Sequence, residues 1–155
     1  MEATRERAWE PLTKYTQREA LRRHALAVEA STAWYARHFD EDEEFWEAVL
    51  SHAEHLGMPR DTPLKKALFA CDELSGFVHA CGLVRPTGIA GLEPKSVKKK
   101  LKQPSFAAGV HREEVYAGAE GLGLDLDDHI RNVVEAMQPI APELGLRTAD
   151  TADTT

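Results

Sequence analysis

The sequence predicts an all-α fold in a single domain. Nearly every periodic segment places its apolar residues at helical spacing, and the alternation of apolar and polar residues that is typical of strands is absent. Glycine and proline cluster between these segments, where helices begin and end. A chain of 155 residues can bury a core of its own. We therefore expect one domain over residues 1–146 and a disordered polar tail, RTADTADTT, over 147–155.

Two helices are expected before residue 40. Thr4 can cap a short helix toward Tyr15, which Pro11 would kink unless the helix begins near it. Thr16 and Glu19 match a capping box, in which each side chain accepts a backbone N–H at the start of a helix. That second helix runs to about Phe39, and one of its faces carries four residues that are expected to point inward: Leu21, His24, Val28 and Tyr35.

Residues typical of helix starts and stops bound the next two predicted helices. The acidic run at 40–44 suits the positive end of a helix dipole, and Gly57 followed by Pro59 ends that helix. Thr62 and Pro63 then stand in the order of a cap followed by proline at the first helical position. The helix that they begin is apolar around most of its circumference as far as Gly82. We expect it to be the central, buried helix of the domain.

The last third of the domain alternates loops and helices. Residues 85–94 contain too much glycine and proline for regular structure and predict a loop. Residues 96–101 predict a short helix with its lysines outside, and another helix is expected from about Arg112 to Glu120. Asp125 and Asp128 begin the final helix, which ends near Gln138, before Pro139.

The net charge limits the expected partners, and the cysteines and hydropathy indicate the expected cell compartment. The net charge of −7 argues against binding to nucleic acids or membrane surfaces, which require a basic footprint. Cys71 and Cys81 lie on one predicted helix about 15 Å apart, too far for a disulfide. They are typical of buried thiols in a reducing compartment. No apolar run is long enough to cross a membrane, and the first residues lack the apolar core of a signal peptide, so we expect a cytoplasmic protein.

Asp72 is the most informative residue, because it interrupts the most apolar helix. A buried carboxylate is unfavourable unless it has a partner, and His24 is one candidate, directly or through a metal ion. His52 and His55 are three residues apart on one helix face, a spacing that two ligands of one metal can use. Solvated or hydrogen-bonded histidines are the more common explanation of such a pair. His38 and His79 each suit the end of a helix, where a positive charge is favoured.

Five lysines between Lys95 and Lys102 form the one basic cluster of an acidic chain. Lysine commonly fills exposed helix positions, so a solvated face explains the cluster simply. The alternative is recognition of phosphate, for which Lys98 and Lys99 are the candidate substrate-binding residues.

Four segments together resemble the HD-domain superfamily of metal-dependent phosphohydrolases: LRRHALAVEA, SHAEHLG, TPLKKALFACDELSGFVHACGLVRP and KSVKKKLKQPSFAAGVHREEV. The resemblance covers residues 16–146 and implies a compact all-α bundle. It also implies that His24 and Asp72 are the first and last ligands of a divalent metal, which could be Fe, Mn, Zn, Mg or Ni. His52 is similar to an accessory ligand, and His55 is a looser match.

The chain departs from that family at its central motif. The family places a His-Asp doublet on a second core helix, whereas this sequence contains no His-Asp dipeptide, as though that block had been removed between DEDEEFW and EAVLSHAEH. One hypothesis is a binding or structural module that has lost hydrolysis. The other is an active enzyme in which His24, Asp72 and His52 hold an ion that activates water against a small phosphate ester or nucleotide. The missing block would also leave the central helix bare near Phe77, which predicts a homodimer.

Overall fold

The computed structural model describes residue 14, residues 17–40 and residues 60–146. The predicted helices over 4–15 and 40–57 and the predicted disordered tail lie outside the described residues, apart from single residues at the edges. Within those ranges the prediction of an all-α fold is confirmed, because the chain there forms helices and turns with no strand. The helices are α2 (Glu19–Phe39), α4 (Pro63–Leu83), α5 (Pro94–Leu101), α6 (Arg112–Leu122) and α7 (Leu126–Met137), followed by the 3₁₀ turn η2 (Gln138–Ile140).

Two helices begin where the sequence predicts, each with a side chain that caps its first turn. Thr62 caps α4, and its side-chain oxygen accepts the backbone N–H of Lys65 at 3.3 Å, with Pro63 at the first helical position. Asp125 caps α7 in the same way through the N–H of Asp127 at 2.7 Å. At the start of α2 the N-cap is Arg18, whose side chain makes no cap hydrogen bond, and Thr16 of the predicted capping box lies outside the described residues.

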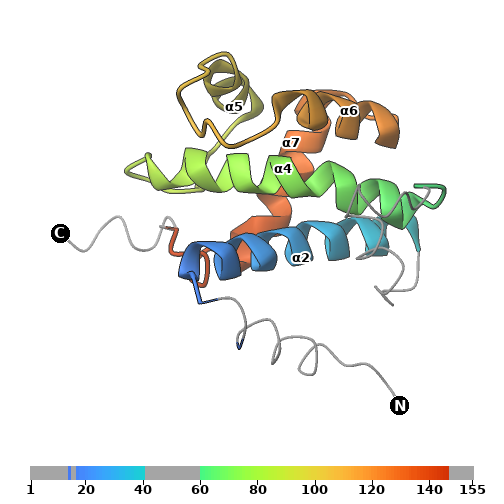
Figure 1. Cartoon of the computed structure of the whole chain (residues 1–155), viewed down its shortest axis with the longest axis horizontal. Helices are drawn as coiled ribbons and strands as arrows, with labels where there is room; N and C mark the ends of the chain where they lie inside the picture. Colours follow the sequence, from blue (N-terminus) through green and yellow to red (C-terminus); the bar gives the residue numbers. More distant parts are fainter. Residues whose placement is uncertain (1–13, 15–16, 41–59, 147–155) are drawn as a thin grey trace.

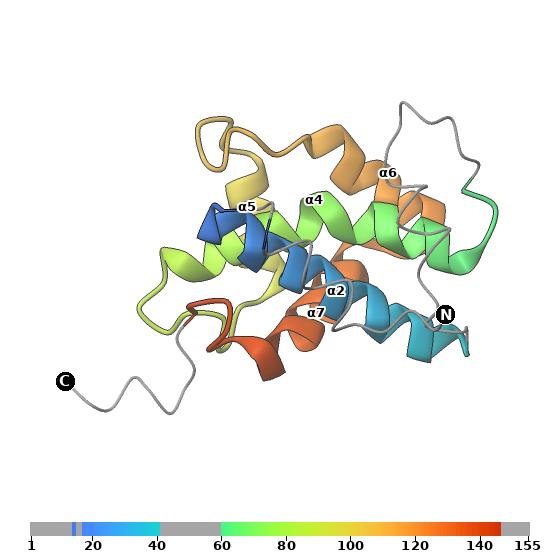
Figure 2. The ribbon, with the colours of Figure 1, turned by 60° about the horizontal axis from the view of Figure 1, so that its bottom comes forward.

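Helix α4 is the centre of the bundle, as its composition predicts. It lies between α2 on one side and α5 and α6 on the other, and α7 passes behind it (Figure 1). When the lower side of Figure 1 is turned forward, α2 crosses in front of α4, and α7 lies beside α2 (Figure 2). Cys71, Leu74, Phe77 and Val78 are at most 1% exposed. Burial of these side chains contributes to the hydrophobic stabilisation that holds the other helices to α4.

Two expectations about exposure are wrong. Leu21, expected on the inner face of α2, is 51% exposed. Phe77, expected to be bare, is fully buried. The ring of Phe106 covers it edge to face, with the centroids 5.5 Å apart. A homodimer therefore remains a prediction, but a bare central helix no longer supports it.

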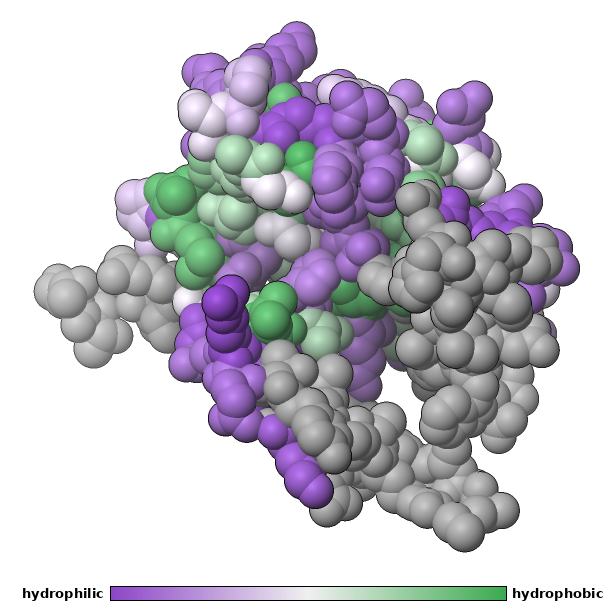
Figure 3. Space-filling model, in the orientation of Figure 1, coloured by the Kyte–Doolittle hydropathy of each residue, from purple (hydrophilic) through white to green (hydrophobic). Residues whose placement is uncertain are grey.

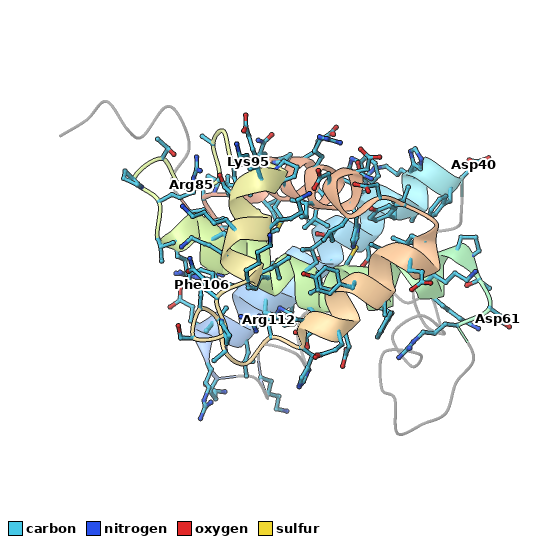
Figure 4. The ribbon with its side chains drawn as sticks, turned by 90° about the horizontal axis from the view of Figure 1, so that it is seen from above. Asp40, Asp61, Arg85, Lys95, Phe106 and Arg112 are labelled. Carbon is cyan, nitrogen blue, oxygen red and sulfur yellow. The ribbon has the colours of Figure 1, made fainter. Side chains whose placement is uncertain are left out.

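The loop that carries Phe106 is held by one arginine. Arg112 donates hydrogen bonds to the backbone carbonyls of four residues before it: Leu101, Gln103, Phe106 and Val110. Figure 4 shows Arg112 at the start of α6, with the loop of Phe106 between it and α5. The guanidinium thus satisfies carbonyls that an irregular loop leaves without helical partners, and it fixes the aromatic cover over α4.

The C-terminal end of α4 has an apolar surface. Leu83 and Val84 are 54% and 56% exposed, and the hydrophobic area at that end of the molecule is visible in Figure 3. Beside them is an open hollow of about 400 Å³, which is lined by residues 82–86 and 145–146. Among the helices that the structure describes, none combines the length and the apolar character that crossing a bilayer requires.

Candidate functional site

The structure brings His24 and Asp72 together across the contact between α2 and α4. The Nε2–H of His24 donates to Asp72 Oδ1 at 3.0 Å, although the two residues are 48 positions apart. The His24 side chain is 40% exposed and that of Asp72 is 21% exposed. The expectation that Asp72 has His24 as a partner is confirmed, and the contact that the structure shows is direct.

The pair favours a charged imidazole. The hydrogen bond to Asp72 raises the pKa of His24 above 6.5, and the charges of Asp72 and Glu73 raise it further, while partial burial opposes them. The other ring nitrogen faces α4 as well, since a Cβ atom at Gly76 would lie 3.4 Å from His24 Nδ1. The imidazole thus packs on α4, with Nε2 bonded to Asp72 and Nδ1 beside Gly76.

The other predicted site residues do not join this pair in the described structure. His52 and His55 lie outside the described residues, so their predicted part in a metal site stays a prediction. Lys98 forms an ion pair with Asp127 of α7, with Nζ 2.6 Å from Oδ1, and Lys99 is exposed. Both lysines are on α5, which lies on the opposite side of α4 from α2 (Figure 1).

Glu73, the next residue of α4, holds a different helix. Its carboxylate accepts the backbone N–H of His111 at 2.9 Å and the Nδ1–H of the same residue at 3.0 Å. His111 is the N-cap of α6 and makes no side-chain cap of its own. Glu73 therefore caps α6 from the neighbouring helix and places negative charge at the positive end of its dipole. The hydrogen bond to Glu73 and the charges of Glu73 and Glu114 raise the pKa of His111.

A second polar network surrounds two buried side chains, His129 and Tyr35. The Nε2–H of His129 donates to the carbonyl of Ala70 at 3.0 Å, and its Nδ1 accepts the hydroxyl hydrogen of Tyr35 at 2.6 Å. Asn132 donates to the same Tyr35 oxygen at 3.1 Å. Burial lowers the pKa of His129 and raises that of Tyr35, so both side chains are neutral. This arrangement satisfies the imidazole and joins α2, α4 and α7 in the core.

Sequence reasoning did not identify the sites around Glu73 and His129. The spacing of His111 and Glu114, three residues apart at a helix start, is visible in the sequence. Nothing local connects that pair to Glu73, which precedes His111 by 38 positions. His129 and Tyr35 are separated by 94 positions. Only the packing of the helices brings these residues into contact.

The remaining described histidines and the two cysteines make packing contacts or are buried. The Nε2–H of His79 donates to the carbonyl of Leu144 at 2.8 Å, and the ring of His38 stacks on Trp34. Burial raises the pKa of the Cys71 thiol, and it raises that of Cys81 to about 11. Neither cysteine is therefore set up as a thiolate nucleophile.

Comparison of the chain with protein-family models, with curated proteins and with solved structures gave no match. The chemistry of the site must therefore be argued from its geometry. One histidine and one carboxylate, partly shielded from water, can hold two helices together or can supply two ligands to a divalent ion.

Proposed function

We propose that the chain is a helical binding or structural module of the HD-domain lineage in which hydrolysis of phosphate esters has been lost. The observation that carries the proposal is the direct hydrogen bond of 3.0 Å between His24 and Asp72. In this role the pair fastens α2 to α4. The lineage rests on the sequence resemblance, with which the all-α bundle agrees.

The orientation of His24 supports a role in packing. A catalytic or metal-binding imidazole usually directs one nitrogen to the reacting centre and the other to a carboxylate or carbonyl that orients it. Here Nε2 bonds Asp72, and Nδ1 lies against the backbone of α4 at Gly76. The imidazole thus makes its hydrogen bond with the helix that it packs against.

The number of available ligands supports the same proposal. Tight transition-metal sites use three or four protein ligands, and hydrolysis also needs an open position for water. Within residues 14, 17–40 and 60–146, no third His, Cys, Asp or Glu completes a cluster with His24 and Asp72. The lysines that would hold a phosphate are on the far side of α4.

A small phosphorylated molecule remains the class of ligand that suits such a module. Lys95, Lys99 and Lys102 are exposed on and just after α5, and Lys95 projects from that helix in Figure 4. Exposed lysines attract anions even in an acidic chain, because the local field outweighs distant charges that salt screens. Binding there would not require the His24–Asp72 pair.

The test combines a phosphatase assay with variants of the pair. Purified protein is assayed on p-nitrophenyl phosphate and on nucleotides with Mn²⁺, Fe²⁺, Ni²⁺, Zn²⁺ or Mg²⁺. We expect the wild type to show no more hydrolysis than His24→Ala or Asp72→Asn. Metal-dependent turnover that disappears in both variants, while Lys99→Ala retains it, would overturn the proposal.

The alternative function is an active metal-dependent phosphohydrolase using His24, Asp72 and His52. One observation favours it: two ligands about 2.1 Å from one octahedral ion are about 3.0 Å apart, and 3.0 Å is the spacing of His24 Nε2 and Asp72 Oδ1. The same pair could therefore close around an ion with little movement. This alternative needs a third ligand from His52 or His55, and the assay above decides between the two functions.

A further inference from the structure

Three side chains of metal-ligand type converge where α4 meets the start of α6. Glu73 comes from α4, and His111 and Glu114 come from the cap and first turn of α6. His111 Nδ1 lies 3.0 Å from a Glu73 oxygen and 3.6 Å from a Glu114 oxygen. One donor atom from each of the three residues lies within 4.8 Å of the other two. Neither the family resemblance nor the proposed function uses this cluster.

The spacing of these atoms is close to that of a first coordination sphere. Zinc binds imidazole nitrogen and carboxylate oxygen at about 2.0 to 2.2 Å, so two ligands of a tetrahedral ion lie about 3.4 Å apart. The two distances from His111, 3.0 and 3.6 Å, lie on either side of that value. The remaining separation, between the two carboxylates, is within 4.8 Å.

Charge and access also suit a cation. An ion on Nδ1 takes the place of the proton that this nitrogen donates to Glu73, and the neutral imidazole then carries its proton on Nε2. The two carboxylates give such a cluster a charge of −2 before any contribution from Asp72 or Glu113 beside them. The Glu73 side chain is only 17% exposed and is held by the backbone N–H of His111. The His111 side chain is 69% exposed, so solvent reaches the cluster and water can take the fourth position. One ligand is thus fixed in advance, and the site has an open side.

We propose that Glu73, His111 and Glu114 bind a divalent transition-metal ion of the Zn²⁺ class, with water completing the coordination. The ion links α4 to α6 at the point where Glu73 already caps α6. A nitrogen ligand favours Zn²⁺, Co²⁺ or Ni²⁺ over Mg²⁺ and Ca²⁺, which prefer oxygen ligands throughout. Because one ligand is on α4 and two are on α6, binding also stabilises the contact between the helices.

The test is a titration of the full chain, freed of metal, with Zn²⁺ by calorimetry and with Co²⁺ by visible absorption. We expect one equivalent to bind, a rise in the melting temperature, and a Co²⁺ spectrum typical of four-coordination. His111→Ala and Glu114→Gln should each weaken the affinity by about tenfold or more, since each removes one of three ligands. Glu73 is left unchanged because its loss would also remove the cap of α6.

Two controls make the result specific. Glu113→Gln removes the same charge one position away, on an exposed side chain, and should leave the affinity within about twofold of the wild type. His24→Ala separates this cluster from the His24–Asp72 pair and should also retain binding. Absence of saturable binding, an affinity unaffected by His111→Ala, or equal losses in Glu113→Gln or His24→Ala would overturn the proposal. None of these outcomes depends on whether the protein hydrolyses phosphate esters.

Discussion

Asp72 and Glu73 are neighbours on α4, and their carboxylates accept hydrogen bonds from different helices. Asp72 accepts the His24 side chain of α2, and Glu73 accepts both the backbone and the side chain of His111 at the start of α6. Successive residues on a helix point about 100° apart, so two adjacent carboxylates can face two neighbours. These two side chains thus connect one turn of α4 to α2 and α6, its two most extensive packing partners.

The His24–Asp72 pair should contribute measurably to folding. We expect His24→Ala and Asp72→Asn each to lower the free energy of unfolding by about 1 kcal/mol, a value kept small because both groups are partly exposed to water. The double variant should lose less than the sum of the single losses, since either change removes the same interaction between a charged imidazole and a carboxylate. Urea denaturation at pH 6 to 7 measures all three, with Lys99→Ala as the surface control. Fully additive losses would show that the two side chains do not interact.

The contribution of that pair should depend on pH. The pKa of His24 is raised above 6.5 in the folded protein, so the folded state holds the proton more tightly than the unfolded state. The extra stability is complete below about pH 6.5 and is lost as the pH rises through the folded pKa. We expect the stability difference between the wild type and Asp72→Asn to shrink from pH 6 to pH 9. An NMR titration checks the cause: the pKa of His24 should fall in Asp72→Asn, and an unchanged value would contradict the pairing.

Loss of the Tyr35 hydroxyl should be costly although the change is small. Tyr35→Phe leaves Nδ1 of the buried His129 without its hydrogen-bond donor, which costs about 1 to 3 kcal/mol of unfolding free energy. Tyr116→Phe is the matched control, because Tyr116 is 51% exposed and water can replace its partners. Thermal and urea unfolding of both variants measure the difference. Equal stabilities would mean that the buried network adds nothing to the fold.

Two glycines of α6 should respond to alanine in opposite directions. A Cβ atom at Gly118 would lie 2.7 Å from the Cα of Ala70, so α4 and α6 would have to separate, at a cost of about 1 to 3 kcal/mol. A Cβ at Gly121 meets nothing within 4 Å, and Gly121→Ala should stabilise the helix by about 0.5 to 1 kcal/mol. Melting temperatures of the two variants give the comparison. A tolerated Gly118→Ala would contradict the close approach of the two helices.

The sequence by itself determined the class of the fold and the places where several helices begin. Thr62 with Pro63 and Asp125 act on backbone groups two or three residues away, so their effect can be read locally. The apolar circumference of α4 likewise predicts its central position, because a helix that is apolar on most sides must be covered. The cost of a carboxylate in that helix was enough to predict that Asp72 has a partner.

Only the tertiary structure decided which residues became partners. Helical periodicity states which face of a helix is apolar, but it does not state which neighbour covers that face or how far the neighbour extends. Periodicity placed Leu21 inside, although its side chain is 51% exposed. The missing block predicted a bare surface near Phe77, which Phe106 covers in the structure. The bonds from Glu73 to His111 and from Tyr35 to His129 span 38 and 94 positions. Contacts of that length exist only after the helices have packed, because no local interaction of the chain selects them.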